Sequence, residues 1–211
     1  MIQIENVYKS FEGKVLFNDL SVEITDNGRL LILGESGSGK TTLLRMLLGF
    51  VLPDDGKIII DGEKLSLENV WKVRRKMAYV SQEMHLGTGS AEKFIKEVLS
   101  YKNNRQITYN RAKVLELLND FRLDANILTK NLGEFSGGEL QRFTIIVTLL
   151  LNRKIYLLDE VTSALDQPMK ELIVNYFSSM KDKTLIISSH DSLWHNQNYP
   201  TLKIGNNGSS S

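Results

Sequence analysis

A glycine-rich segment constrains the fold of this chain more than any other feature of the sequence. The run Arg29–Leu33 is apolar after Arg29, as is typical of a buried strand, and residues 34–42 after it read GESGSGKTT. Apolar residues at helical spacing come next, namely Leu43, Leu44, Met46, Leu47 and Leu48. A strand, a loop of this composition and a helix are together the setting of a phosphate-binding loop. The chain is therefore expected to bind a nucleoside triphosphate.

Each residue type in this loop has a physical task. Glycines let backbone N–H groups converge on phosphate oxygens, and the helix N-terminus adds partial positive charge. Lys40 is expected to neutralise the β- and γ-phosphates, and Thr41 to ligate Mg²⁺. The alternative, a glycine-rich turn that includes Lys and Thr by chance, fits the strand and helix context poorly. The predicted nucleotide-binding residues here are Gly34, Glu35, Ser36, Gly37, Ser38, Gly39, Lys40, Thr41 and Thr42.

Two adjacent carboxylates, Asp159 and Glu160, follow the apolar run Lys154–Leu158. Side chains alternate along a strand, so these carboxylates point in different directions and are expected to have different roles. Asp159 is predicted to join the Mg²⁺ shell, and Glu160 to act as a general base that orients water beside the γ-phosphate. Alone, the pair would also fit an acidic loop at a strand end. The phosphate-binding loop favours the catalytic interpretation.

A second glycine pair marks the start of a predicted helix. Residues 135–142 read FSGGELQR and precede a helical pattern through residues 145–150. Ser136 followed by Glu139 fits a capping box, which would only start the helix. However, two glycines in the first turn oppose helix formation by about 1 kcal/mol each relative to Ala, so capping does not explain Gly137 and Gly138. They leave a positively polarised helix end free of side chains, as an anion site requires.

Length and composition exclude several classes of protein. The chain has 211 residues, of which 42% are apolar and 24% charged, as in an ordinary folded domain. The formal net charge is only +1, so nucleic acid is not an expected partner. The local basic run Lys72–Lys76 is interleaved with Trp71, Val73 and Met77, which indicates a half-buried segment with a solvated charged edge. Cysteine is absent, which excludes disulfides, thiolate metal sites and cysteine nucleophiles.

Short β-rich runs alternate with helical patterns, which predicts an α/β fold with a mostly parallel, buried sheet. Between Val80 and Ser136 the apolar spacing is helical, through residues 94–99 and 114–118, which indicates an inserted helical subdomain. The polar stretch 102–108 between these helices is expected to be an exposed loop. The predicted strands are Ile2–Val7, Arg29–Leu33, Lys57–Ile60, Met77–Val80, Lys154–Leu158 and Thr184–Ser188.

With these motifs in this order, the sequence resembles the ABC ATPase family over almost its whole length. The family's signature motif is matched by Ser136, Gly137, Gly138 and Glu139, with Gln141 and Arg142 after them. Two positions depart from the commonest pattern: Phe135 stands where Leu is usual, and Glu139 where Gln is. Both are tolerated variants, and the resemblance implies that the signature binds nucleotide.

The resemblance also assigns roles to residues that carry little signal alone. Gln82 is similar to the glutamine that touches Mg²⁺ and the attacking water, and His190 to the histidine that contacts the γ-phosphate. Asp166, in the run Ser163-Ala164-Leu165-Asp166, resembles the D-loop aspartate at the nucleotide. Phe11 is similar to the aromatic residue that stacks on adenine, with Tyr8 as the alternative. The implied catalytic set is Lys40, Gln82, Glu160 and His190, with Thr41, Gln82 and Asp159 around the metal.

The family architecture supplies further expectations. It implies a single ABC ATPase domain over residues 1–211, with a P-loop NTPase core of residues 1–83 and 136–205. An N-terminal antiparallel β subdomain, an inserted helical subdomain of residues 84–135 and a flexible tail of residues 206–211 complete it. ATP and Mg²⁺ are the implied cofactors. The implied active unit is a head-to-tail homodimer, in which the signature of one subunit covers the nucleotide of the other.

The resemblance implies an integral membrane permease as partner, docked on the helical subdomain and the Gln82 loop. No apolar run here has membrane-spanning length, so the chain itself is expected to lie in the cytoplasm, peripherally on the inner face of the cell membrane. The main alternative is a soluble ABC ATPase of DNA repair, chromosome organisation or translation. A GTPase or kinase is disfavoured, because an Asn-Lys-x-Asp motif is missing.

The transported substrate is chosen by the permease rather than by these residues. The segment Ile127–Leu132 and the short stretch after His190 resemble bacterial ATPase subunits assigned to iron or metal export. Compact exporters of lipoproteins or peptides are similar in layout. Metal export and lipoprotein or peptide export therefore both stay open at the level of sequence.

Overall fold

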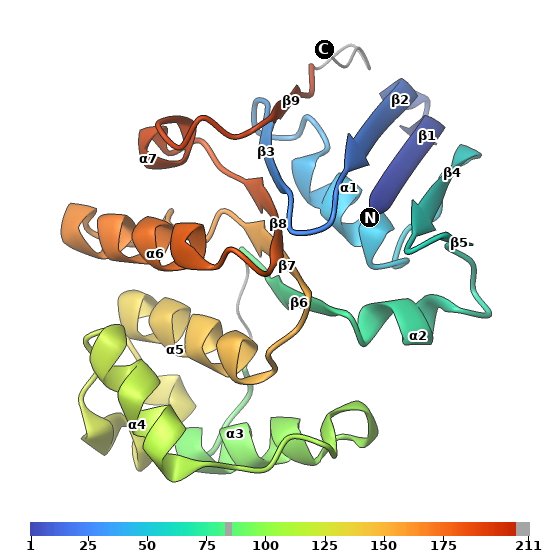
Figure 1. Ribbon diagram of the computed structural model, residues 1–211. Coiled ribbons are helices and arrows are strands. Elements are labelled where there is room, and N and C mark those ends of the chain that lie inside the picture. Colours follow the sequence, from blue (N-terminus) through green and yellow to red (C-terminus); the bar gives the residue numbers. More distant parts are fainter. Residues whose placement is uncertain (83–85, 206–211) are drawn as a thin grey trace.

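The chain folds around two β-sheets of different character (Figure 1). The computed structural model describes residues 1–82 and 86–205. The first sheet is antiparallel in the order β2-β1-β4-β5. Its strands are β1 (Ile2–Phe11), β2 (Lys14–Ile24), β4 (Asp55–Ile60) and β5 (Glu63–Lys64). This sheet is the antiparallel β subdomain that the family resemblance implies.

The second sheet is parallel in the order β6-β7-β8-β3-β9. Every residue of β7 and β8 is buried, as expected for strands covered on both faces. The predicted parallel sheet is therefore confirmed. Its strands are β3 (Arg29–Leu33), β6 (Met77–Val80), β7 (Ile155–Asp159), β8 (Thr184–Ser188) and β9 (Thr201–Lys203).

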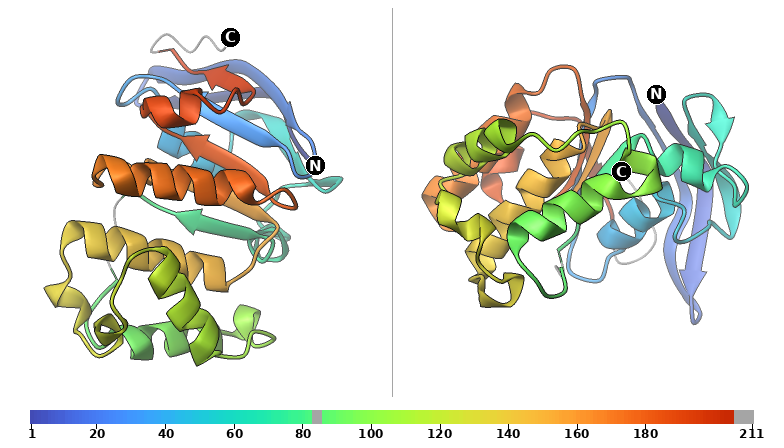
Figure 2. Two further views of the ribbon diagram at one scale, coloured as in Figure 1. Left: turned by 60° about the vertical axis from the view of Figure 1, so that its left-hand side comes forward. Right: turned by 90° about the horizontal axis from the view of Figure 1, so that it is seen from below.

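Helices cover the parallel sheet on both faces (Figures 1 and 2). Helix α1 packs between the two sheets in one apolar core, and α5 and α6 pack on the other face of the parallel sheet in a second core. The α-helices are α1 (Lys40–Leu47), α2 (Val70–Arg74), α3 (Ala91–Ser100), α4 (Arg111–Asp120), α5 (Gly137–Leu150), α6 (Gln167–Ser179) and α7 (Ser192–His195). Short 3₁₀ turns occur at Lys102–Asn104, Ala125–Leu128 and Leu132–Glu134.

Helices α3 and α4 lie with α5 at one end of the molecule, away from the antiparallel sheet (Figure 1). They correspond to the helical segments predicted between Val80 and Ser136. The expected exposed loop at 102–108 is wrong in part, because Asn104 is 6% exposed and donates to Val98 O at 2.7 Å. Asn104 also accepts a hydrogen bond from Arg153, which ties this turn to the core. The first residues of the expected subdomain, 84 and 85, and the tail 206–211 lie outside the described residues.

The parallel sheet brings four chain segments together at one edge. The carboxyl ends of parallel strands meet at the same edge of a sheet, where ligands of α/β proteins bind. The glycine-rich loop follows β3, Gln82 follows β6, Glu160 follows β7 and His190 follows β8. The strand order thus places four separately predicted motifs around one position.

Candidate active site

The glycine-rich loop has a backbone that side chains would block. A Cβ at Gly34 would lie 2.5 Å from both Ile204 O and Ser38 Oγ, which no side chain tolerates. Gly39 has φ +109°, and a Cβ there would approach the ring of Phe17 to 3.0 Å. Both positions therefore require glycine for reasons of geometry. Helix α1 begins directly after this turn, so its N-terminal N–H groups face the loop.

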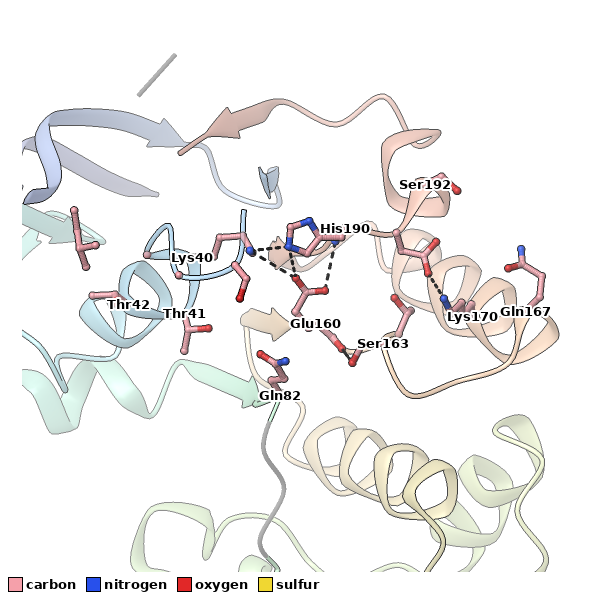
Figure 3. Close-up of a pocket in the computed structure, with 16 residues that line it drawn as sticks. Lys40, Thr41, Thr42, Gln82, Glu160, Ser163, Gln167, Lys170, His190 and Ser192 are labelled. Carbon is pink, nitrogen blue, oxygen red and sulfur yellow. Dashed lines mark hydrogen bonds and ion pairs between the residues drawn. The ribbon is translucent and has the colours of Figure 1, made fainter. Parts of the chain in front are cut away.

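Lys40 is held at the centre of the site. Its side chain is 8% exposed, and its Nζ donates to Gly34 O at 2.8 Å and to Glu35 O at 3.1 Å. The same Nζ lies 2.9 Å from His190 Nε2 and 3.9 Å from Glu160 Oε1 (Figure 3). The three residues come from α1, from the turn after β7 and from the turn after β8. These three residues, which the sequence analysis assigned to one site, lie together in the structure.

Glu160 is placed by its backbone as much as by its side chain. Its φ of +50° lies in the left-handed region, which is uncommon outside glycine, and its N–H donates to Ser188 O at 3.0 Å. The side chain is 12% exposed and its Oε1 lies 3.5 Å from His190 Nε2. The backbone N–H of His190 donates to Glu160 Oε2 at 3.4 Å. The carboxylate therefore stands beside a cation and at the cavity, as a base for a water molecule requires.

Asp159 lies in a different environment from its neighbour. It is fully buried, and Tyr79 Oη donates to its Oδ2 at 3.0 Å while Ser188 Oγ donates to its Oδ1. Burial, with the charge of Asp159, raises the pKa of the Tyr79 hydroxyl well above its usual range. Tyr79 therefore stays a neutral donor that orients the carboxylate. Sequence reasoning missed this residue, because its strand reads simply as buried.

The residues predicted to ligate Mg²⁺ are suited to it. Thr41 and Gln82 line the cavity with oxygen-bearing side chains, and Asp159 lies at the end of the adjoining strand. Hydroxyl, amide and carboxylate oxygens are the ligands that Mg²⁺ prefers, usually together with phosphates and water. Among residues 1–82 and 86–205, three or more His, Asp or Glu side chains do not gather as an all-protein metal site. Thr41, Gln82 and Asp159 therefore offer oxygen donors of the kind that Mg²⁺ prefers, although Asp159 itself does not line the cavity.

These segments enclose a cavity of about 680 Å³, open on one side (Figure 3). Sequence reasoning had named Ser36, Gly37, Gly39, Lys40, Thr41, Thr42, Gln82, Glu160 and His190, all of which line it. It had not assigned the remaining lining residues as site residues: Leu16, Thr162, Ser163, Gln167, Lys170, Asp191 and Ser192. Most of these lie within a few residues of Glu160 or His190 in the chain, which was the available signal.

The signature segment stands apart from this cavity. Ser136 caps α5, its Oγ accepting from the N–H of Glu139 at 3.2 Å, and the Glu139 carboxylate accepts from the N–H of Ser136 at 2.8 Å. This capping box explains both residues structurally. The N–H of Ser136 and then the ammonium of Lys130 lower the pKa of Glu139. None of Ser136–Glu139 lines the described cavity, so its own chain does not bring the signature to Lys40.

The two glycines of the signature are not required by packing. A Cβ at Gly137 would meet nothing within 4 Å, and one at Gly138 would only touch Leu165 Cδ2 at 3.8 Å. Packing within the chain therefore does not account for either glycine.

Replacing Gly137 with Ala is expected to stabilise the protein while weakening its activity. Ala favours a helical turn over Gly by up to about 1 kcal/mol, which raises Tm by roughly 2–4 °C in a chain of this size. The added methyl group would stand where an anion has to approach the helix end. Thermal unfolding and ATPase assays on the same samples test this, and a less stable but fully active variant would contradict it.

Phe11 and Asp166 do not line the cavity. Phe11 ends β1 before a two-residue turn, is 45% exposed and lies under the ammonium of Lys9 at 4.9 Å. Leu16, on the same hairpin, lines the cavity instead, and Tyr8 does not. Asp166 caps α6, accepting from the N–H of Met169 at 3.0 Å. The adenine contact of Phe11 and the nucleotide contact of Asp166 stay predictions.

Comparison with known proteins places this arrangement in a family. The family model described as ABC transporter matches residues 17–163. The protein named probable iron export ATP-binding protein FetA, of Escherichia coli, is 32% identical over 196 residues, which are 90% of this chain and 85% of that protein. An energy-coupling factor transporter ATP-binding protein of Mycoplasmopsis synoviae is 32% identical over 200 residues, 90% of this chain and 74% of that protein.

Other matches differ in how much of the relative is covered. An export ATP-binding/permease protein of Rickettsia typhi is 33% identical over 198 residues, but this chain spans only 34% of its length. Among solved structures, a dimeric bacterial ABC transporter cassette superposes with a TM-score of 0.87 at 25% identity, covering 100% of this chain and 98% of that one. The same cassette in a post-hydrolysis state with ADP and Pi gives the same values.

The fold and the site define the class: a glycine-rich loop on a parallel sheet, with Lys40, Glu160 and His190 around one cavity, is a P-loop nucleotide-hydrolysing ATPase. Within that class, the chain belongs to the ABC transporter family. It has the ATP-binding cassette of that family, and the sequence-based assignment is confirmed.

Proposed function

We propose that this chain energises a membrane transporter by clamping two ATP molecules between two head-to-tail copies of itself. One observation carries the proposal. Lys40, Glu160 and His190 share one cavity, while the signature glycines at the start of α5 do not line it and are free of side chains for no reason of packing. A second copy could supply those glycines to the open side of the cavity. The dimeric cassette of the same fold supports this arrangement.

The site's chemistry is positioning and electrostatic stabilisation. Loop N–H groups and Lys40 hold the β- and γ-phosphates, and Glu160 orients the water that attacks the γ-phosphate. His190, beside both Lys40 and Glu160, is placed to contact the same phosphate. Thr41, Gln82 and Asp159 would hold Mg²⁺, which supplies charge neutralisation on the phosphate oxygens. Loss of the γ-phosphate removes the bridge between the two copies and lets them part.

The direct test is Mg²⁺-dependent ATPase activity over a range of protein concentrations. Activity is expected to rise more steeply than protein concentration, because only the dimer has complete sites. EDTA and the Lys40→Ala variant are expected to abolish it, since each removes positive charge from the phosphates. Activity that is linear in protein concentration down to the lowest measurable level would mean that one chain acts alone.

A membrane permease is the proposed partner, and the chain is proposed to sit on the inner face of the cell membrane. Among the described residues, no helix is both long enough and apolar enough to span a bilayer.

Two aromatic rings and an arginine, Phe50, Trp71 and Arg74, form what we call the aromatic patch on the surface. Phe50 and Trp71 are each 62% exposed. The Arg74 guanidinium lies between their rings, at 4.0 and 4.9 Å from the centroids. The half-buried segment with a charged edge expected at residues 71–77 is present, since Val73 and Met77 are buried and Lys72 and Arg75 are exposed, but Trp71 lies on the exposed side.

We infer that this aromatic patch extends the docking surface proposed for the helical subdomain and the Gln82 loop. Arg74 Nε also donates to Leu48 O at 2.7 Å and so joins α2 to the end of α1. Trp and Arg are among the residues that most often dominate binding at an interface.

Changing Phe50 and Trp71 together to Ser is expected to lower copurification of the permease at least about tenfold, since interface aromatics often contribute more than 1 kcal/mol each. ATPase activity of the isolated chain is expected to stay unchanged, because neither residue lines the cavity. Lys181→Ser, at an exposed position after α6, is the matched control. Normal copurification of the double variant would place the docking surface elsewhere.

For the substrate, we propose iron or another metal ion, exported. The likeness to the iron export protein of Escherichia coli over 85% of that protein supports it. A deletion strain is expected to accumulate metal; normal metal content would favour a lipoprotein or peptide exporter, or the soluble ABC ATPase alternative.

A further inference from the structure

An ion pair without an assigned role lies among the residues that line the cavity. Lys170, on α6, places its Nζ 3.0 Å from Asp191 Oδ2, and both residues line the cavity (Figure 3). The side chains are only 26% and 11% exposed, so water screens this pair less than it screens a surface pair. The pair joins α6 to the residue that directly follows His190.

Asp191 is anchored on several sides. Its Oδ1 accepts from the N–H of Leu193 at 3.0 Å, which caps α7, and its own N–H donates to Ser189 Oγ at 3.0 Å. Burial raises the pKa of the Asp191 carboxyl, but the N–H of Leu193, the Lys170 ammonium and the Thr162 hydroxyl together lower it more. The carboxylate is therefore charged and its position is defined by contacts with two other chain segments.

His190 depends on its neighbours for its placement. Its side chain is 54% exposed, whereas Ser189 before it is fully buried and Asp191 after it is anchored. An exposed imidazole has few packing contacts to hold it. Ser189 and Asp191 therefore hold the backbone on each side of His190, whose Nε2 lies 2.9 Å from Lys40 Nζ.

The backbone of Lys170 is also hydrogen-bonded to the end of the loop that follows Glu160. Its backbone N–H donates to Asp166 O at 2.9 Å, in the first turn of α6, directly after residues 161–166. Thr162, in that loop, is 1% exposed. A displacement of the loop would shift the start of α6, and the ion pair would carry that shift to Asp191.

We propose that Lys170 is a positioning residue for ATP hydrolysis: through its ion pair with Asp191 it holds His190 in register with Lys40 and Glu160, and links His190 to the loop 161–166. This proposal rests on the proposed ATPase function. Lys170 acts here through Asp191 and not by contact with the nucleotide.

The test is a double-mutant cycle with variants that spare the local structure. Lys170→Met removes the charge but keeps a long apolar stem, and Asp191→Asn removes the charge but keeps a good helix cap. Each is expected to lower kcat about fivefold, the equivalent of ~1 kcal/mol for one partly buried ion pair, with KM for MgATP within about twofold. The double variant is expected to lose little more than either single one. Lys170→Arg, which keeps the positive charge, is expected to have the kcat of wild type.

A second measurement does not depend on catalysis. The imidazole resonances of His190, followed by NMR without nucleotide, are expected to shift alike in Lys170→Met and Asp191→Asn and to return in Lys170→Arg. Unshifted resonances in the two charge variants, or a KM that rises as much as kcat falls, would overturn the proposal. A wild-type protein without ATPase activity would defeat the proposed function, while the NMR result would still decide whether the ion pair positions His190.

Discussion

Glu160→Gln is expected to stop ATP hydrolysis and to trap an ATP-bound dimer. The amide keeps the shape of the side chain, and its oxygen can still accept the N–H of His190, which donates to Oε2 at 3.4 Å. It cannot accept a proton from the attacking water, so kcat is expected to fall by roughly 10²–10⁴-fold. Removing the negative charge beside the γ-phosphate also favours bound ATP. The bridge between the two copies then persists.

Gel filtration with MgATP measures this directly, with Lys40→Ala as the control. That variant lacks the ammonium that meets the phosphates and is expected to stay monomeric. Wild type is expected to show a dimer only transiently, because hydrolysis removes the bridging phosphate. A Glu160→Gln protein that elutes as a monomer with saturating ATP would contradict the proposed mechanism.

Two inactive variants are expected to regain activity when mixed. Lys40→Ala removes the phosphate-binding ammonium from the cavity of its own chain. Gly138→Asp puts a carboxylate at the signature, where it repels phosphate. A head-to-tail heterodimer of the two has one site with an intact Lys40 and an intact Gly138. A dimer of two identical variant chains has no whole site to bind bridging ATP, whereas the mixed dimer has one of two. Activity clearly above that of either variant alone and below that of wild type is therefore expected.

The matched control mixes Gly138→Asp with the double variant Lys40→Ala/Gly138→Asp, which leaves no dimer with an intact site. The Gly138→Asp variant is expected to fold, because a Cβ at this position would only touch Leu165 Cδ2 at 3.8 Å. Thermal unfolding checks this separately. A mixture as inactive as its parts, with both proteins folded, would mean that the signature does not serve the cavity of a second copy.

Sequence reasoning found strands with a regular apolar pattern and missed β2, β5 and β9. The buried strands β7 and β8 were predicted to within a residue of their ends. Strand β2 was missed, because exposed Asn18 and Asp19 interrupt its alternation and Asp19 has φ +58°. Strand β9 has three residues, and its pairing with β3 comes from tertiary contacts. Local pattern indicates a strand only when one or both of its faces are consistently apolar.

Some site residues were likewise found from the sequence, and others only from the structure. The glycine-rich loop and Glu160 were named from local motifs and His190 from the family resemblance, and the structure places them together. Tyr79 and Lys170 carry no motif, and only the fold shows that each donates to an aspartate on another segment. Ser136 was interpreted in two ways from sequence, as a helix cap and as an anion site. The capping box is present, and it leaves the glycines beside it unexplained.

What the sequence by itself determined is the chemistry at each strand end, because a few adjacent residues define a phosphate-binding loop or a helix cap. Only the tertiary structure decided which of these ends meet. Lys40 and His190 lie 150 residues apart in the chain and 2.9 Å apart in space. That contact follows from the order of strands in the parallel sheet, in which β3 lies beside β8. The order depends on long-range packing, which no local segment encodes.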